Sequence, residues 1–156
     1  MESFHWDDSF VTGLSEVDQE HHHLVDLINQ FGEMLAANEL VLDHIEGVFK
    51  ELADYAQYHF DEEEGLMCRV GIDPRHYKIH LDKHHDFLNE VTSMHADVSP
   101  DNPDSARHLL EFLTHWLVYH IIGTDQNMAR QIKAINSGLS PGEAYEKEER
   151  EADNST

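Results

Sequence analysis

The chain has 156 residues, one cysteine and a formal net charge of −22 at pH 7, which suits a single compact domain without an internal disulfide. Its excess of acid disfavours nucleic acid and anionic membrane surfaces as partners, because both are polyanions. The start, MESFHWDDSF, lacks the basic and apolar regions of a signal peptide, and no apolar run approaches the roughly 20 residues that span a bilayer. We therefore expect a cytoplasmic protein that does not enter membranes.

Residues 1–17 are expected to form an arm outside the main helices. The segment shows no helical period, yet Phe4, Trp6 and Phe10 are too apolar to be left in water. We therefore expect this arm to pack along the helices that follow.

Four long helices are predicted after the arm. Each begins at a polar residue that can cap a helix, two of them with proline in the first turn, and each carries an apolar stripe at helical spacing. Such helices joined by short loops predict an all-α fold, an antiparallel up-down-up-down four-helix bundle about 30 Å long over residues 18–138. The expected helices run from Asp18 to about Asn38, from Asp43 to near Gly71, from Asp73 and Pro74 onward, and from Asn102 and Pro103 to near Gly138.

Residues 139–156, LSPGEAYEKEEREADNST, are charged and poor in apolar side chains. We expect a short extra helical stretch within an acidic tail or linker. An acidic helix-forming run after a Ser-Pro turn is typical of a linker to a signalling output domain. A role as the input domain of a larger sensor therefore stays open.

Fourteen histidines are the most unusual feature of the composition, and several fall on core-facing stripes. In the segment YHFDEEEGLM, His59 and Glu63 share a helix face with Leu52 and Leu66, because the steps between them are three, four or seven residues. Burying a carboxylate without a partner costs several kcal/mol, and no Lys or Arg lies on an apolar stripe to neutralise it. Another positive group is therefore expected beside Glu63.

The other three helices repeat this pattern at the same level of the core. His80 and His84 are one turn apart in HLDKHHDF, His21 precedes Leu24 and Ile28, and His120 follows Trp116 by one turn. Imidazole together with carboxylate oxygen suits iron, manganese or zinc, and the absence of a cysteine ligand argues against a thiolate-selected metal. This many ligands exceeds the need of one tetrahedral zinc ion, so the pattern predicts two metal ions with bridging carboxylates.

Asp125 is the candidate for a second bridging carboxylate. It lies five residues after His120, and five residues of regular helix rotate a side chain by about 140°, which aims the two apart. Gly123 lies between them. We therefore predict a π-type widening or a break that turns Asp125 inward.

Together these residues resemble the bacterial hemerythrins. The similarity covers about residues 4 to 135 and rests on four segments: WDDSFVTGLSEVDQEHHHLVDLIN, HFDEEEGLM, HLDKHHDF and HWLVYHIIGTD. As a set these motifs are highly specific to that family.

The resemblance implies a ligand set and a function. His80, His84 and His120 would hold one iron, His21 and His59 a second, and Glu63 and Asp125 would bridge the two irons together with an oxo or hydroxo group. The second iron would keep a vacant position for dioxygen, and the expected lining of the oxygen pocket is Leu24, Ile28 and Trp116. The resemblance thus implies an oxygen-binding protein and not an enzyme, serving oxygen storage, delivery or sensing.

The chain departs from the family pattern at two points. Glu20 precedes the first ligand histidine, where the family usually has glutamine, and the interval between the second and third motifs is about two residues longer than in many members. The longer interval leaves a rival register in which His76 and His80, in HYKIH, supply the ligands. His80 with His84 is favoured because Phe87 then falls where the family's phenylalanine does.

For the remaining polar residues on these helices the simplest assignment is structural. Histidines outside the seven-residue set, His76 included, are expected at the surface or hydrogen-bonded in the core. Asp61, Glu62 and Glu64 indicate a solvated helix face.

Two other classes of function stay open. A di-iron enzyme acting on peroxide, dioxygen or nitric oxide would need similar residues, although di-iron oxygenases generally use more carboxylates and fewer histidines. An iron storage protein would instead bind many weakly held ions on its acidic surface.

Overall fold

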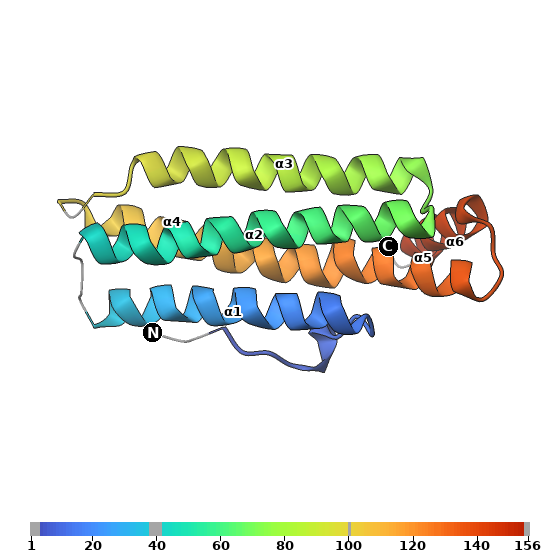
Figure 1. Ribbon diagram of the computed structural model, residues 1–156, viewed down its shortest axis with the longest axis horizontal. Helices are drawn as coiled ribbons and strands as arrows, with labels where there is room; N and C mark the ends of the chain where they lie inside the picture. Colours follow the sequence, from blue (N-terminus) through green and yellow to red (C-terminus); the bar gives the residue numbers. More distant parts are fainter. Residues whose placement is uncertain (1–3, 38–41, 100, 155–156) are drawn as a thin grey trace.

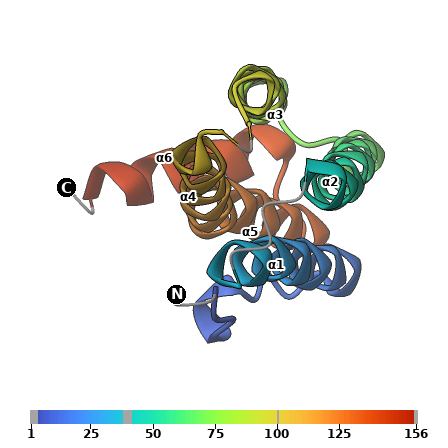
Figure 2. The ribbon, with the colours of Figure 1, turned by 90° about the vertical axis from the view of Figure 1, so that its left-hand side faces the viewer.

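The structure is a computed structural model that describes residues 4–37, 42–99 and 101–154. Long helices lie side by side along the molecule (Figure 1), and the end-on view in Figure 2 shows them around a common axis. The predicted all-α four-helix bundle is confirmed. In chain order the elements are the 3-10 turn η1 (Asp8–Phe10), α1 (Ser15–Ala36), α2 (Leu42–Val70), α3 (Pro74–Ala96), α4 (Pro103–Tyr119), the π-helical segment η2 (His120–Asp125), α5 (Gln126–Asn136) and α6 (Pro141–Asn154).

The predicted starts of α3 and α4 are confirmed. The Asp73 carboxylate accepts a hydrogen bond from the backbone N–H of Arg75 at 2.8 Å, and Pro74 occupies the first turn, where its missing N–H costs no helical hydrogen bond. Pro103 occupies the same position in α4.

The prediction that Asp18 caps α1 is wrong, because the helix begins three residues earlier, at Ser15. The Asp18 carboxylate instead accepts hydrogen bonds from the backbone N–H and the hydroxyl of Thr12, at 2.9 and 2.7 Å. It also accepts from the N–H of Gly13, whose φ of 83° turns the chain into the helix. Asp18 therefore holds the turn before the helix from a position inside it.

The arm packs along α1, as Figure 1 shows. Phe4 and Phe10 are buried in the same apolar cluster as the bundle core. The backbone of Phe4 accepts from and donates to the Asn29 side chain, at 3.0 and 2.7 Å. The Gln126 amide donates to the backbone oxygen of Val11 at 2.9 Å, so the arm also reaches α5.

Helix α6 lies across one end of the bundle, close to where α2 ends and α3 begins (Figure 1). Arg130 on α5 donates to the buried Glu148 carboxylate at 2.9 Å, and the guanidinium of Arg75 lies 4.3 Å from the centre of the Tyr145 ring. Ala144 is buried as well. Part of the segment expected to be a tail or linker is therefore a packed helix.

The core consists of two apolar clusters with a polar layer between them. The larger cluster contains Leu24, Phe60, Phe87 and Leu117 among others, and the smaller consists of Val17, Met67, Ile72, Met128 and Ile132. The candidate ligands fall between members of the two clusters on each helix of the bundle. No helix in the described ranges is long and apolar enough to cross a membrane.

Replacing Phe10 with alanine tests the packing of the arm. Phe10 is only 6% exposed, so Phe10→Ala should lower the free energy of unfolding by about 3 kcal/mol. The neighbouring Val11 is 46% exposed, so Val11→Ala should change it by less than about 0.5 kcal/mol. Urea-induced unfolding measures both, and similar losses in the two variants would contradict the docking described here.

Candidate metal centre

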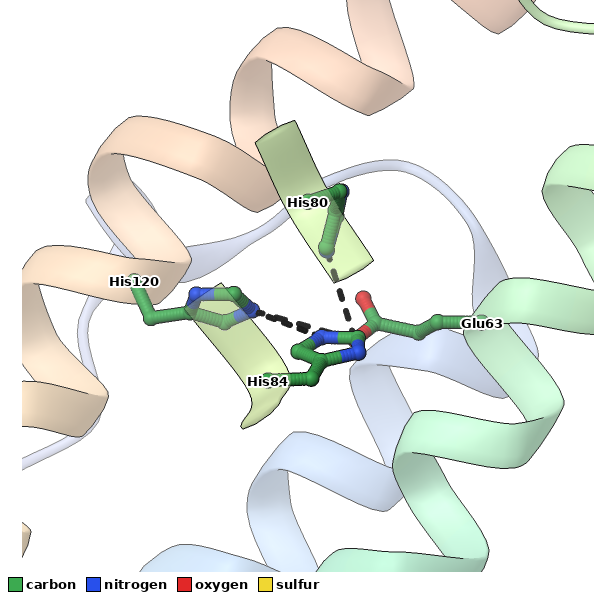
Figure 3. A group of neighbouring side chains, drawn as sticks. All are labelled: Glu63, His80, His84 and His120. Atoms are coloured by element: carbon green, nitrogen blue, oxygen red, sulfur yellow. Dashed lines mark hydrogen bonds and ion pairs between the residues drawn. The ribbon is translucent and has the colours of Figure 1, made fainter. Parts of the chain in front are cut away.

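The structure brings all seven predicted ligand residues together in the middle of the bundle. Each is at most 4% exposed. Figure 3 shows four of them, with His80 and His84 from α3, Glu63 from α2 and His120 from the start of η2 pointing toward a common centre. The other three are His21 on α1, His59 on α2 and Asp125 at the end of η2.

The π-helical segment η2 is what brings Asp125 into this group. Each π turn holds more residues than an α turn, so His120 and Asp125 face the same way, with Nε2 and Oδ1 3.1 Å apart. This confirms the widening predicted from their spacing. Gly123 is not required by sterics, because its φ is not positive and a Cβ added there would meet no atom within 4 Å.

The residues form two groups, each able to hold one metal ion. The three-histidine cluster consists of His80, His84, His120 and Glu63. The Nε2 atoms of His84 and His120 lie 3.2 Å apart, and Oε1 of Glu63 lies 3.3 Å from Nε2 of His84. Ligands that share an ion at about 2.0–2.2 Å are separated by about 3 Å when adjacent, so these distances suit a common ion.

The two-histidine cluster consists of His21, His59, Glu63 and Asp125. Nε2 of His21 lies 2.9 Å from Asp125 Oδ2, and Nε2 of His59 lies 3.1 Å from Glu63 Oε1. The other oxygen of Asp125, Oδ1, faces Nε2 of His80 at 3.1 Å. Asp125 thus directs one oxygen to each cluster, and Glu63 belongs to both, the arrangement that two bridging carboxylates require.

The polar atoms at the centre lack hydrogen-bond partners. Within the described part of the chain, Nε2 of His21, His59 and His80 and both oxygens of Glu63 and Asp125 are buried without one. Burying such groups unpaired is costly, and two cations at the centre would bind all of them. The residues present therefore fit a pair of metal ions.

The pKa shifts of the central residues in the absence of metal also indicate that the layer needs positive charge. Burial lowers the pKa of His59, but the charge of Glu63 and the hydrogen bond to Glu20 raise it to about 10. Burial also lowers the pKa of His80, whereas the nearby carboxylates of Asp125 and Glu63 raise it to about 9. Burial raises the pKa of both carboxyls, and Glu63 adds to this at Asp125, yet the histidines hold both pKa values below their usual range. Protons on imidazole thus supply the positive charge in the metal-free chain.

Carboxylates outside the two clusters orient two of the candidate ligand rings. Nδ1 of His59 lies 2.7 Å from Oε1 of Glu20, and Nδ1 of His84 lies 2.9 Å from Oε2 of Glu64. A carboxylate that accepts from Nδ1–H leaves Nε2 free as a ligand and makes it more basic. Glu64 was expected on a solvated face, and periodicity alone gives no signal for this bond across helices. Glu20 occupies the position where the sequence departs from the family pattern.

The structure favours the register with His80 and His84. Both lie in the three-histidine cluster, whereas His76 contacts Nδ1 of His80 through its own Nε2 at 3.0 Å. His76 is buried, and burial together with the neighbouring His80 charge lowers its pKa to about 4, so it is neutral at pH 7. It is a hydrogen-bonded core histidine.

Apolar and aromatic side chains enclose the centre on one side. Phe60 stacks on His84 with ring centres 3.9 Å apart, and Trp116 stacks on His120 at 4.2 Å. Next to them is a cavity of about 20 Å³. Its lining residues are Leu24, Ile28, Leu52, Ala56, Phe60, Phe87, Leu113, Trp116 and Leu117, which include all three residues expected to line an oxygen pocket.

Stability of the metal-free chain should fall as the pH rises from about 6.5 toward 9–10. The raised pKa values of His59 and His80 mean that the folded state holds these protons more tightly, so their stabilisation is complete below the unfolded value of about 6.5 and is lost above it. We expect a decrease of at least about 1.4 kcal/mol, the equivalent of one pKa unit. Urea unfolding of metal-free protein between pH 6 and 10 measures it.

Saturating metal serves as the control for this experiment. Bound ions replace the protons on the ligand nitrogens, so the decline above pH 6.5 should disappear in the metal-loaded protein. A stability that does not change between pH 6.5 and 9.5 in the metal-free chain would contradict the electrostatics described here.

Comparison with known proteins identifies the family. The family model described as the hemerythrin HHE cation binding domain matches residues 12–132. The bacteriohemerythrin of Clostridium acetobutylicum is 31% identical over 130 residues, 79% of this chain and 96% of that protein. The bacteriohemerythrin of Stenotrophomonas maltophilia is 29% identical over 129 residues (83% and 81%), and a hemerythrin-like protein of Naegleria gruberi is 30% identical over 122 residues (78% and 87%). The chain, with its buried cluster of histidines and carboxylates, belongs to the hemerythrin family.

Proposed function

We propose that this protein binds dioxygen reversibly at a non-haem di-iron centre, for oxygen storage, delivery or sensing. One iron would be held by His80, His84 and His120, the other by His21 and His59, with Glu63 and Asp125 bridging both. The observation that carries the proposal is the unequal number of imidazoles, three in one cluster and two in the other.

This inequality leaves one position open. Iron bound by nitrogen and oxygen commonly takes about six ligands. Three imidazoles, two bridging carboxylates and a shared oxo or hydroxo group would fill the three-histidine cluster, whereas the two-histidine cluster would lack one ligand. A pair of ferrous ions would supply the electrons with which dioxygen is held at that open position. In this proposal, the chain would provide no side chain as the sixth ligand of the iron in the two-histidine cluster.

The apolar cavity supports a small, uncharged ligand. At about 20 Å³ it exceeds the roughly 10–15 Å³ that one water-sized molecule needs, so there is room for a diatomic gas but not for a larger organic substrate. Its aliphatic and aromatic walls offer no hydrogen-bond network for water. Dioxygen in this cavity would therefore meet almost only apolar walls.

The same walls favour binding over turnover. None of the nine described residues that line the cavity carries an acid or base. Enzymes that reduce dioxygen or peroxide deliver protons from positioned groups, and such a group would have to contact the bound ligand. The apolar walls therefore support reversible release.

In a sensor, α6 is the element that would connect to an output domain or partner. It contacts Arg75 at the start of α3 and Arg130 on α5, two helices that contribute to or adjoin the metal centre. This role is part of the proposal.

An optical titration tests the proposed function. The metal-free chain is loaded anaerobically with ferrous iron, the iron is counted, and dioxygen is then added and removed. We expect two irons per chain and a near-ultraviolet to visible charge-transfer band that forms with dioxygen and disappears when it is removed. A band that never forms, or that does not reverse, would contradict reversible binding, and rapid turnover of peroxide or nitric oxide would then favour a di-iron enzyme.

Filling the cavity should weaken dioxygen binding without changing the iron content. Ala56 lines the cavity and is 2% exposed, so the larger side chain in Ala56→Leu should occupy the space and lower dioxygen affinity at least about tenfold, or 1.4 kcal/mol. Ala96, an exposed residue at the end of α3, provides the control Ala96→Leu, whose affinity should not change. Equal affinities in two variants that each bind two irons would show that the cavity is not the oxygen site.

A further inference from the structure

His76 is a buried imidazole that belongs to neither candidate metal cluster. It lies in the first turn of α3, 4% exposed, with Nε2 3.0 Å from Nδ1 of the ligand His80. Its Nδ1 lies 3.0 Å from the amide nitrogen of Gln131 on α5, which is 1% exposed. A row of polar groups thus extends from the three-histidine cluster into α5 through an otherwise apolar region.

In the metal-free chain the positively charged His80 carries a proton on each ring nitrogen, so its Nδ1–H donates to Nε2 of the neutral His76. Nε2–H of His80 faces Oδ1 of Asp125 at 3.1 Å and occupies the atom that a metal ion needs. The single proton of His76 then lies on Nδ1, 3.0 Å from the Gln131 side-chain amide, whose oxygen can accept it when the amide is turned by half a rotation.

We propose that His76 and Gln131 are positioning residues that hold His80 in the tautomer able to bind metal, an inference that rests on the di-iron function proposed above. When an ion binds Nε2 of His80, it displaces the proton of that nitrogen, while Nδ1–H stays in place and donates to Nε2 of His76. The proton of His76 stays on Nδ1 and donates to the oxygen of the Gln131 amide. Each ring then keeps one proton, and His76 stays neutral.

Turning the Gln131 amide gives its oxygen, otherwise without a partner, the N–H of His76 to accept from. The Asn127 amide, whose oxygen accepts from the Gln131 nitrogen, turns with it so that this second hydrogen bond is kept with the roles reversed. At His59 and His84 the hydrogen-bond acceptors for Nδ1 are the carboxylates of Glu20 and Glu64. His80 differs because its partner, His76, is neutral. A neutral acceptor makes the ligand nitrogen less basic than a carboxylate does. The three-histidine cluster therefore contains one histidine, His80, with a less basic Nε2 than a carboxylate-bonded histidine has.

The two positioning residues lie on segments that α6 holds in place. Arg75, next to His76, binds Asp73 and lies over Tyr145, while Arg130, next to Gln131, binds Glu148. In each pair of adjacent residues, the arginine contacts α6 and its neighbour belongs to the row that leads to His80. Helix α6 therefore contacts both segments that carry the positioning residues.

Cobalt binding tests the inference with the metal alone. The metal-free chain and its His76→Phe variant are titrated with Co²⁺ against a competing chelator. Phenylalanine fills the space of the imidazole but cannot accept a hydrogen bond, so the affinity for one of the two ions should fall about 10- to 100-fold. In the proton spectrum of the Co²⁺-loaded protein, the shifted N–H signal of His80 should disappear or exchange with solvent.

Two further variants separate positioning from packing. His76→Gln places an oxygen near the former Nε2 atom and should restore both the affinity and the N–H signal. His95→Phe is the control on the same helix. His95 lies away from the metal centre, with its Nε2 2.7 Å from Oε2 of Glu46, so its loss should change neither the Co²⁺ affinity nor the N–H signal. If His76→Phe does not fold, Gln131→Leu interrupts the same row from its other end and should weaken the same ion.

The outcomes distinguish this inference from the function on which it rests. Failure of the unmodified chain to bind two Co²⁺ ions would overturn the di-iron centre itself. Two ions bound with unchanged affinity and an unchanged N–H signal in His76→Phe or Gln131→Leu would overturn the positioning role alone.

Discussion

Two carboxylates buried among five imidazoles are the constraint on which the rest of the molecule depends. Glu63 and Asp125 are 1% and 0% exposed, and no lysine or arginine is among the buried residues of the described chain. Such a layer would oppose folding unless positive charge accompanied it, whether as protons on His59 and His80 or as metal ions. The two apolar clusters on either side supply the hydrophobic stabilisation that lets four helices cross this layer.

The departures from a regular bundle follow from this layer. A regular α4 would turn Asp125 away from the centre, so the widened segment η2 places it opposite His21, and α5 then continues the helix. Ring orientation is set from outside the layer, by Glu20 for His59 and by Glu64 for His84. The candidate ligand rings of His59 and His84 are thus oriented by carboxylates outside the layer.

The fold and the positions of the candidate ligands could be predicted from the sequence because both depend on periodicity. Spacing places His59 and Glu63 on a core face, and the five-residue step from His120 predicts the widening. The hydrogen-bond partners were not accessible, because a helical period tells which way a side chain faces and nothing about which atom it meets on another helix. The hydrogen bonds of Glu64 to His84 and of Gln131 to His76 show this limit. Asp18 shows it too, because its carboxylate binds the turn before the helix, where Gly13 reverses the chain.

The two sides of the candidate metal layer differ in chemistry, and the difference would suit the dioxygen binding proposed above. The cavity lies in the larger apolar cluster, against Phe60 and Trp116, and none of its nine described lining residues carries an acid or base. The polar row of His76 and Gln131 adjoins the smaller cluster on α3 and α5. In the proposed function, this separation would keep the exchangeable protons of the row away from bound dioxygen. A carrier would benefit from it, because protons delivered to the bound gas favour its release in a form reduced by the irons.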